Sequence, residues 1–304
     1  MTMHIMEEKI MEELIKRILI KENINYKQIT KATSGFTNVV YFVDEMVIKI
    51  ATDNEKKKKL KKEINIYKNI ELSNIPQYIS SGDIENSSYL IISKIIGKGL
   101  YSVWHTLNSD EKENCIKQIA DILKSFNKQN ADFLDDDYKI YDWKDFVIGQ
   151  LLRNIEGLNK IGIDTNKICK FVETNDLFNQ NIYGLVYNDA HFDNFIYNNG
   201  KIYLIDFDRV IYAPIDYEML IFKTMCDNPS KFASEEDEDS VFDEDFKEVY
   251  SWLKKYYNEL FNIPNIDKRI KVYQFNYLCN QALNMKNKEI GKNWAKELIE
   301  EFEA

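Results

Sequence analysis

The sequence predicts an α+β fold of two lobes, the first rich in β-strands and the second mostly helical. Short apolar runs bounded by turn residues, which are typical of paired strands, occupy much of the first hundred residues. Beyond residue 104 the apolar residues recur at helical spacing instead. Gly97 and Gly99 lie where the pattern changes, and glycine often marks the end of an element. We therefore expect an N-terminal lobe over residues 1–96 and a C-terminal lobe over residues 97–304.

Composition and charge exclude several classes of protein. The chain has 304 residues, of which 44% are hydrophobic and 30% charged, as in ordinary globular proteins. Its net charge of −10 argues against a nucleic-acid-binding protein. No apolar run approaches the length of a membrane span, and Met1 to Met6 lacks the apolar core of a signal peptide. The four cysteines are far apart and lack zinc-site spacing, so we expect reduced thiols in a cytoplasmic protein.

The beginning of the chain predicts a helix followed by a hairpin. Apolar residues at helical spacing favour an amphipathic helix over Glu7 to Lys21 that packs on a sheet. The apolar runs Val39–Val43 and Met46–Ile50, separated by Asp44-Glu45, predict two paired strands. The preceding turn contains Gly35, and its backbone amides would either contact a phosphate or form a plain hairpin connection.

Lys49 lies inside the second apolar strand, where a lysine must face solvent or find an anion. The next helix is expected over residues 53–70, with Lys56 to Lys62 forming a solvated face. Glu63, fourteen residues after Lys49, is the one acid among the apolar positions of this helix. We expect Glu63 to pair either with Lys49 or with lysines of its own helix.

Helical periodicity and one hairpin account for most of the C-terminal lobe. Helices are expected over residues 111–127, 141–159, 166–178, 217–226, 243–260, 266–285 and 291–302. Phe195 to Tyr197 and Ile202 to Ile205 are β-rich runs joined by Asn198-Asn199-Gly200. Asparagine and glycine tolerate the positive φ that tight hairpin turns need, so these residues predict a β-hairpin.

Three oxygen-bearing side chains flank this hairpin. Asp189 and Asn194 precede its first strand and Asp206 follows its second, so all three leave the hairpin at the same end. Mg²⁺ prefers oxygen ligands and takes few of them from protein when phosphates supply the others, which suits Asn194 and Asp206. A hydroxyl nucleophile needs an acceptor for its proton, which suits Asp189. The pattern predicts phosphoryl transfer, and the alternative is an ordinary polar hairpin with acids at its ends.

These residues resemble the motifs of the aminoglycoside phosphotransferase family, which has a two-lobe protein-kinase-like fold. Asp189 and Asn194, followed by Asp206-Phe207-Asp208, match its His-Gly-Asp-x-His-x-x-Asn and Asp-x-Asp/Glu motifs. His191 falls on the second histidine of the first motif.

The resemblance covers about residues 30–225 and has two departures. Tyr187 replaces the first histidine of the motif and Asn188 replaces its glycine. The pattern Ser-Gly-x-Thr-Asn-x-Val-Tyr at residues 34–41 is similar to the nucleotide loop of the same family.

What the resemblance implies is an ATP- or GTP-dependent kinase that phosphorylates a hydroxyl of a small molecule. Asp189 would be the catalytic base or the group that orients the hydroxyl, while Asn194 and Asp206 would hold Mg²⁺. Lys49, steadied by Glu63, would neutralise the phosphates of the nucleotide. The implied nucleotide-binding residues are Gly35, Lys49, Glu63 and, through their backbone, Ser93 and Ile95.

Three function classes stay open. They are an aminoglycoside kinase of antibiotic resistance, a metabolic kinase of choline, an amino sugar or a similar molecule, and a non-catalytic nucleotide-binding relative. The intact set of polar residues weighs against the third class. Two acidic groups, Asp132 with Asp135 to Asp137 and Glu235 to Asp239, would either attract a cationic acceptor or only keep the chain soluble. The acceptor, the choice between ATP and GTP, and the oligomeric state are not predicted.

Overall fold

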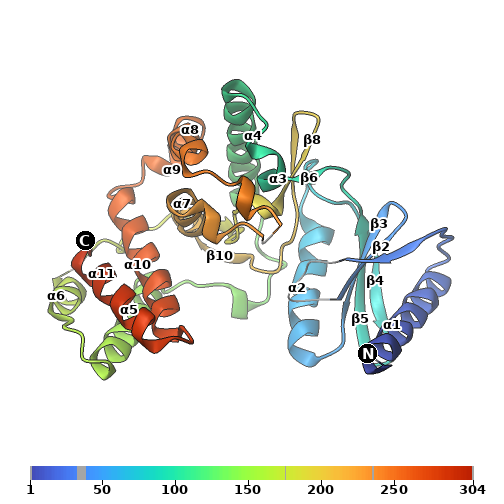
Figure 1. Ribbon diagram of the computed structural model, residues 1–304, viewed down its shortest axis with the longest axis horizontal. Coiled ribbons are helices and arrows are strands. Elements are labelled where there is room, and N and C mark those ends of the chain that lie inside the picture. The colour runs from blue at the N-terminus through green and yellow to red at the C-terminus, as the bar shows by residue number, and fades with distance from the viewer. Residues whose placement is uncertain (1, 33–38, 175, 235, 303–304) are drawn as a thin grey trace.

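The computed structural model describes residues 2–32, 39–174, 176–234 and 236–302. It has the predicted α+β architecture, with an antiparallel sheet in the N-terminal part and a helical C-terminal part (Figure 1). The expected boundary after residue 96 falls between β5 (Ser87–Ser93) and β6 (Lys98–Gly99), and we keep it as a proposal. No helix in these described ranges is both long and apolar enough to cross a membrane.

The N-terminal lobe is built on a five-stranded sheet with the order β1-β2-β3-β5-β4. Its neighbouring strands are all antiparallel, and successive residues of each strand face opposite sides of the sheet. Ile48 and Ile50 of β3 therefore face one side, and Lys49 and Ala51 face the other. Besides β5, the strands are β1 (Ile29–Lys31), β2 (Val39–Val43), β3 (Met46–Ala51) and β4 (Tyr78–Ile84).

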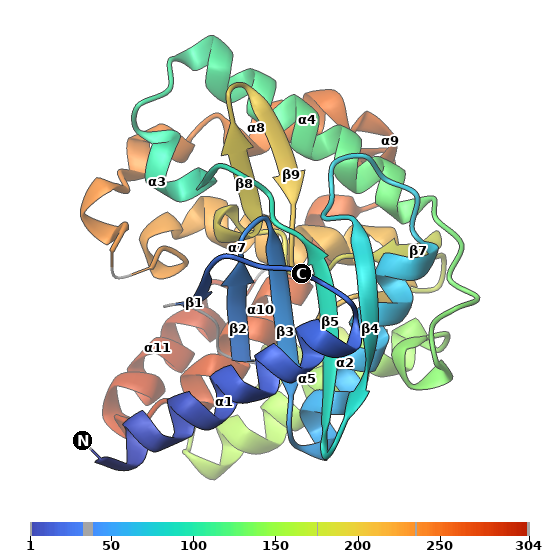
Figure 2. The same cartoon turned by 90° about the vertical axis from the view of Figure 1, so that its right-hand side faces the viewer.

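One helix covers each face of this sheet (Figure 2). Helix α1 (Thr2–Lys21) packs Leu14, Ile15, Ile18 and Leu19 against the side of Ile48 and Ile50, which confirms the expected amphipathic helix on a sheet. Helix α2 (Asn54–Asn69) covers the side to which Lys49 points. It begins after Asp53, whose carboxylate accepts a hydrogen bond from the backbone N–H of Lys56 at 2.9 Å.

The C-terminal lobe consists of helices around two small sheets. Its helices are α3 (Leu100–Trp104), α4 (Ser109–Asn127), α5 (Trp143–Lys160), α6 (Asn166–Thr174), α7 (Met219–Asp227), α8 (Val249–Tyr256), α9 (Asn258–Phe261), α10 (Ile266–Asn284) and α11 (Lys288–Glu300). Short 3₁₀ segments are η1 (Asp136–Tyr138), η2 (Phe192–Asn194), η3 (Ile215–Glu218), η4 (Pro229–Lys231), η5 (Glu238–Ser240) and η6 (Asp243–Phe246). The strands are β6, β7 (Tyr183–Val186), β8 (Phe195–Asn198), β9 (Lys201–Leu204) and β10 (Ile211–Pro214).

The predicted hairpin is confirmed as β8 and β9. Asn199 and Gly200 form its two-residue turn with φ of 48° and 82°, the left-handed pair that hairpin turns of this length favour. β6 pairs with the other side of β8, while β7 and β10 form a separate antiparallel pair. These two small sheets fix the loops that follow β7 and β9, which carry Asp189 and Asp206.

Residues 243–260 form η6, α8 and α9 where the periodicity predicted a single helix, so that prediction is wrong in its continuity. The break lies at Tyr257, with φ −118° and ψ 46°. Its ring is buried and its hydroxyl donates to the side-chain oxygen of Asn127 in α4 at 2.5 Å. The chain leaves helical geometry where this tertiary contact forms. No proline or glycine at this point of the sequence indicates the break.

An apolar core joins the two lobes next to the catalytic hairpin. Phe207, which follows Asp206, is fully buried. Its ring lies 5.1 Å from the ring of Tyr67 in α2 and 5.7 Å from that of Phe126 in α4. Phe207 thereby connects the helix under Lys49 with the C-terminal lobe and fixes the position of Asp206 between them.

Candidate active site

Lys49 lies between two carboxylates from different parts of the chain. Its Nζ is 2.6 Å from Oε1 of Glu63 in α2 and 3.1 Å from Oδ1 of Asp206 after β9. The Glu63 side chain is fully buried and that of Lys49 is 12% exposed, whereas Asp206 is 43% exposed. The structure thus chooses Lys49 as the partner of Glu63 over the lysines of α2, and it leaves one carboxylate of the trio open to solvent.

Charge and burial act against each other in this trio. Burial alone would lower the pKa of Lys49, but the carboxylates of Glu63 and Asp206 raise it well above its usual value. Burial would also raise the pKa of Asp206, but Lys49 holds it below its usual value. Lys49 is therefore a fixed cation and Asp206 a fixed anion at neutral pH, which is the arrangement that a phosphate and a metal ion need.

Asp189 is held from three sides in the loop after β7. Asn194 donates its amide nitrogen to the Asp189 backbone oxygen at 2.9 Å and to Asp189 Oδ2 at 3.1 Å. Nη1 of Arg209 lies 3.4 Å from Asp189 Oδ1, and Nε2 of His191 lies 3.7 Å from Oδ2. Asp189 remains 18% exposed, so its carboxylate is positioned but still accessible to a small molecule.

Each of the two loops has one non-glycine residue in the left-handed backbone region. Asn188 and Asp206 both have φ of 62°, in the left-handed region that non-glycine residues seldom adopt. Such positions persist only where the surrounding structure holds them, and they occur often at functional sites. Asp206 is itself a carboxylate of the site, and Asn188 directly precedes Asp189.

Glu218, which sequence reasoning missed, fixes the backbone before Asp189. It is fully buried at the end of η3, and its carboxylate accepts the backbone N–H groups of Tyr187 at 2.7 Å and Asn188 at 3.2 Å. Burial raises the pKa of Glu218 to about 7, although these two N–H groups oppose the rise. The only local signal was an acid inside a helical apolar pattern, which also fits many surface positions.

Lys62 corrects the expectation of a wholly solvated lysine face on α2. Its side chain is buried, donates to the backbone oxygen of Val210 at 3.0 Å, and places Nζ 4.3 Å from the centre of the Tyr138 ring. Burial lowers the pKa of Lys62 to about 8, which the nearby Asp208 partly opposes. This contact ties the N-terminal lobe to the segment that follows Asp206, because α2 packs here against the other lobe.

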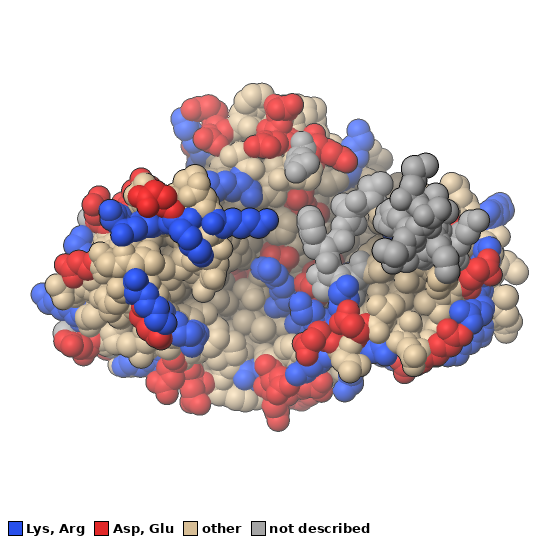
Figure 3. All heavy atoms as spheres, turned by 60° about the horizontal axis from the view of Figure 1, so that its bottom comes forward, with Lys and Arg blue, Asp and Glu red and all other residues tan. Residues whose placement is uncertain are grey.

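The remaining predicted nucleotide-binding residues are placed less tightly. Gly35 lies outside the described residues. Ser93 ends β5 opposite Met46 of β3, and half-buried Ile95 follows in the segment that leads to the C-terminal lobe. Figure 3 shows a hollow between the two lobes, with atoms of both basic and acidic residues inside it.

The donor set fits a cation that is completed by other ligands. Within the described ranges there is no group of three or more His, Cys, Asp or Glu side chains that could hold a metal by themselves. Asp206 supplies an ionised, accessible carboxylate, and Asn194 uses its nitrogen toward Asp189, which leaves its amide oxygen available. One or two hard oxygens with room for phosphates and water are what Mg²⁺ commonly takes.

The acidic groups predicted from the sequence lie in two places, apart from Glu235, which is outside the described residues. Asp137 is 2.5 Å from Nζ of Lys58, and Asp135 is 3.7 Å from Nζ of Lys61, so both pair with α2. Asp237 lies near Asp193 of the catalytic loop. Burial raises the pKa of Asp193, the charge of His191 opposes this rise, and the charge of Asp237 adds to it. Asp135 and Asp137 of the first group therefore bridge the two lobes.

A lysine–glutamate pair over a hairpin that presents Asp189, Asn194 and Asp206 defines the protein-kinase-like class of phosphotransferases. The model of the phosphotransferase enzyme family (APH) matches residues 28–254, and the chain belongs to that family. The predicted family, the protein-kinase-like fold and the class of enzyme, a small-molecule phosphotransferase acting on a hydroxyl, are thereby confirmed.

Solved structures share the fold over nearly the whole chain. The streptomycin–ATP–APH(2'')-IIa ternary complex has a TM-score of 0.68 at 20% identity and covers 95% of both chains. Macrolide 2'-phosphotransferase MphH from Brachybacterium faecium has a TM-score of 0.62 at 9% identity over 96% of this chain and 99% of its own. A choline/ethanolamine kinase family protein from Mesorhizobium loti has a TM-score of 0.56 at 10% identity, over 91% of this chain and 89% of its own. No curated protein matches the sequence.

Proposed function

We propose that this phosphotransferase moves the γ-phosphate of ATP or GTP to a hydroxyl of a small molecule, in the cytoplasm. The observation that carries the proposal is the convergence of Lys49, Asp189, Asn194 and Asp206 from both lobes. The similar structures support the nucleotide, since they include complexes with ATP, ADP and GDP.

Lys49 contacts the phosphates of the nucleotide in this proposal. Its cation is fixed in direction by Glu63, so little reorganisation is needed when the phosphates arrive. Gly35 and the backbone of Ser93 and Ile95 bind other parts of the nucleotide. Asn194 and Asp206 would hold Mg²⁺, which would neutralise phosphate charge when bound.

Asp189 receives the proton of the acceptor hydroxyl. The hydroxyl oxygen forms a bond to the γ-phosphorus while the bond from that phosphorus to the β,γ-bridging oxygen breaks, and the nucleoside diphosphate leaves. Asn194 and Arg209 keep the Asp189 carboxylate in place, so that the hydroxyl is oriented before transfer. Catalysis then comes mainly from positioning and charge neutralisation.

Two acceptor classes follow from the comparisons and from the sequence. Two of the similar structures are complexes with streptomycin and kanamycin, which supports an aminoglycoside acceptor and a role in antibiotic resistance. A macrolide enzyme and a choline/ethanolamine kinase family protein share the fold at lower identity, which supports other hydroxyl compounds as the second class.

Calorimetry with ATP and GTP, with and without Mg²⁺, tests the proposal. We expect the wild-type protein to bind nucleotide more tightly with Mg²⁺, and Asp206→Ala to lose both this difference and turnover while keeping its fold. Asp121→Ala, an exposed position on α4, is the matched control and should behave as wild type. Unchanged turnover in Asp206→Ala would remove Asp206 from the metal site.

A further inference from the structure

A cavity of about 230 Å³ opens in the C-terminal lobe between α5 and α10. Its lining consists of three tyrosines, four side-chain amides and Arg153. Ligand sites are usually clefts of roughly 300–1,000 Å³ with a few placed polar groups, so this one is small and unusually polar. Among the residues that the structure describes, none of those lining the cavity is an aspartate or glutamate.

Two lining residues, Tyr217 and Tyr277, connect the cavity with the loop that carries Asp189. Tyr217 lines one wall and directly precedes Glu218, whose carboxylate holds the backbone before Asp189. Tyr277 lines the wall that α10 forms. Burial raises the pKa of its hydroxyl, the charge of Arg209 opposes this rise, and the charge of Asp189 adds to it. Both charged groups of the Asp189–Arg209 pair are therefore close enough to influence the Tyr277 hydroxyl.

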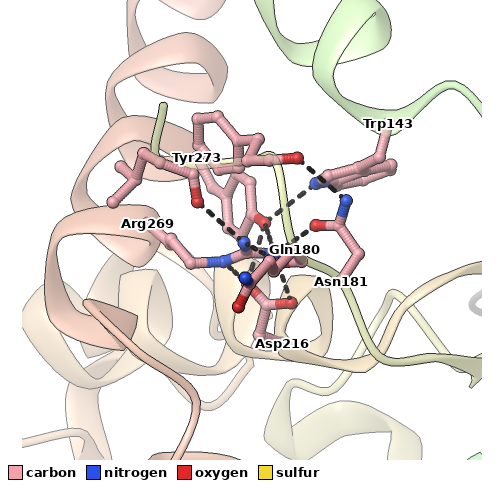
Figure 4. Close-up of polar contacts among 8 residues, drawn as sticks. Trp143, Gln180, Asn181, Asp216, Arg269 and Tyr273 are labelled. Carbon is pink, nitrogen blue, oxygen red and sulfur yellow. Dashed lines mark hydrogen bonds and ion pairs between the residues drawn. The ribbon is translucent and has the colours of Figure 1, made fainter. Parts of the chain in front are cut away.

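Walls of this cavity are held by buried polar contacts. Arg269 is 1% exposed and donates Nε and Nη2 to the two oxygens of Asp216, at 2.7 and 2.9 Å (Figure 4). The Tyr273 hydroxyl donates to Asp216 at 2.8 Å and accepts Nε1–H of Trp143 at 3.0 Å. The ring of Tyr217 packs against Trp143 and Tyr273 with centroids 4.8 and 5.0 Å away. The aromatic wall is therefore formed before a ligand arrives.

A second buried contact fixes the floor between the two helices. Asn154 donates to the side-chain oxygen of Asn276 at 3.0 Å, and both residues are nearly inaccessible to solvent. Amides and phenols offer both donors and acceptors, so they match the hydroxyl groups of a polyol better than a charge. Tyrosine rings add flat apolar surface for the carbon face of a sugar ring.

The charges around the cavity disfavour a cationic acceptor. Arg153 lines it and has no ion-pair partner within the part of the chain that the structure describes. Arg209 stands beside Asp189 and adds a second positive charge. An ammonium group bound among the described lining residues would lose its hydration without gaining a carboxylate from them, and it would meet the positive charge of Arg153, which costs binding free energy.

We propose that the acceptor is a small hydroxylated molecule without a positive charge, about one sugar ring in size, bound in this cavity with Arg153 at its far end. The proposal rests on the phosphotransfer proposed above and names its acceptor class. Aminoglycosides, which are polycations, are then poor acceptors. Uncharged polyols and sugar acids fit the amides, the phenols and Arg153.

A panel of single-ring acceptors in three charge classes tests this directly. Neutral sugars and nucleosides, sugar acids, and amino sugars are compared with kanamycin by nucleotide consumption, and the phosphorylated product is identified by mass spectrometry. We expect the best neutral or acidic acceptor to exceed the best amino compound at least tenfold in kcat/KM. An amino sugar or kanamycin as the best acceptor overturns the proposal, and so does a panel with no phosphorylated member.

Charge reversal at Arg153 provides the second arm. We expect Arg153→Glu to lower kcat/KM for sugar acids at least tenfold and to raise that for amino sugars, so the preference shifts toward cations. Lys160→Glu makes the same charge change at an exposed position of the same helix, outside the cavity lining, and should leave the preference unchanged. The same acceptor preference in Arg153→Glu and wild type overturns the placement of the acceptor.

Failure of this inference and failure of the proposed function give different results. If the protein binds no magnesium nucleotide and transfers phosphate to no compound, the proposed function fails and the acceptor class fails with it. If it binds nucleotide and phosphorylates aminoglycosides efficiently, the function stands and only the acceptor class is wrong.

Discussion

Replacement of Glu218 by glutamine tests how the catalytic loop is held. The Glu218 carboxylate accepts two backbone N–H groups, from Tyr187 and Asn188, in a site from which solvent is excluded. Glutamine has nearly the same shape but only one oxygen, so its NH₂ group must face one of these donors. An unsatisfied buried group of this kind costs about 1–3 kcal/mol of stability.

The pH dependence of stability gives a sharper expectation. Burial raises the pKa of Glu218 to about 7, above the ordinary carboxyl value of 4.5 that the unfolded chain has. Between pH 4.5 and 7 the folded protein keeps a proton that the unfolded chain has lost. The stability from this group is therefore fully present below the lower value and is lost as pH rises to the upper one, at about 1.4 kcal/mol per pH unit and about 3 kcal/mol in all.

Denaturant unfolding from pH 4.5 to 8 of wild type, Glu218→Gln and the exposed control Glu71→Gln measures this contribution. We expect the decline with pH to be shallower in Glu218→Gln by up to about 1.4 kcal/mol per pH unit, and unchanged in the control. We also expect kcat to fall, since a shift of about 1 Å near reacting groups can cost about 10²-fold. Parallel stability curves for wild type and Glu218→Gln would refute the assignment of this pKa.

Two further substitutions test the buried ion pairs. Lys49→Met should lower phosphate transfer by about 10²–10³-fold. It should lower the free energy of unfolding by only about 1–3 kcal/mol, because Glu63 can take up a proton. Kinetics and thermal unfolding of one preparation measure both effects, and normal turnover with a collapsed stability would make Lys49 structural. Arg269→Met should lower the free energy of unfolding by about 3–5 kcal/mol, because it leaves Asp216 buried without its partner. The double variant Arg269→Met/Asp216→Asn should recover part of this loss in denaturant titrations. An unchanged denaturation midpoint in Arg269→Met would contradict this role of the pair.

Local chemistry made the centre of the site predictable. Asn199 and Gly200 demand a two-residue turn, so the strands on either side and the end at which Asp189, Asn194 and Asp206 emerge follow from short-range rules. For Lys49 the sequence left two choices, solvent or an anion, and the structure places it between two carboxylates. Glu63 was one of two choices, and the packing of α2 on the sheet decided between them.

Long-range packing accounts for what the sequence did not predict. Lys62 belongs to a run of lysines that is mostly solvated, and only its contact with Val210 and Tyr138 of the other lobe buries it. Glu218 and Asp216 alternate along one short segment, yet each meets a different distant partner. The cavity between α5 and α10 is formed by side chains from η3, α5 and α10, which no sequence spacing brings together.

Transfer of labelled γ-phosphate into an acceptor tests the central claim most directly. ATP or GTP labelled at the γ-position is incubated with Mg²⁺ and the neutral and acidic acceptors, using wild type and Asp189→Asn, which keeps the side-chain shape but cannot take up the hydroxyl proton. We expect label on an acceptor hydroxyl with wild type and a loss of at least about 10²-fold with Asp189→Asn. Label on an acceptor at equal rates with both proteins, or none on any acceptor while nucleotide binds, would contradict this claim.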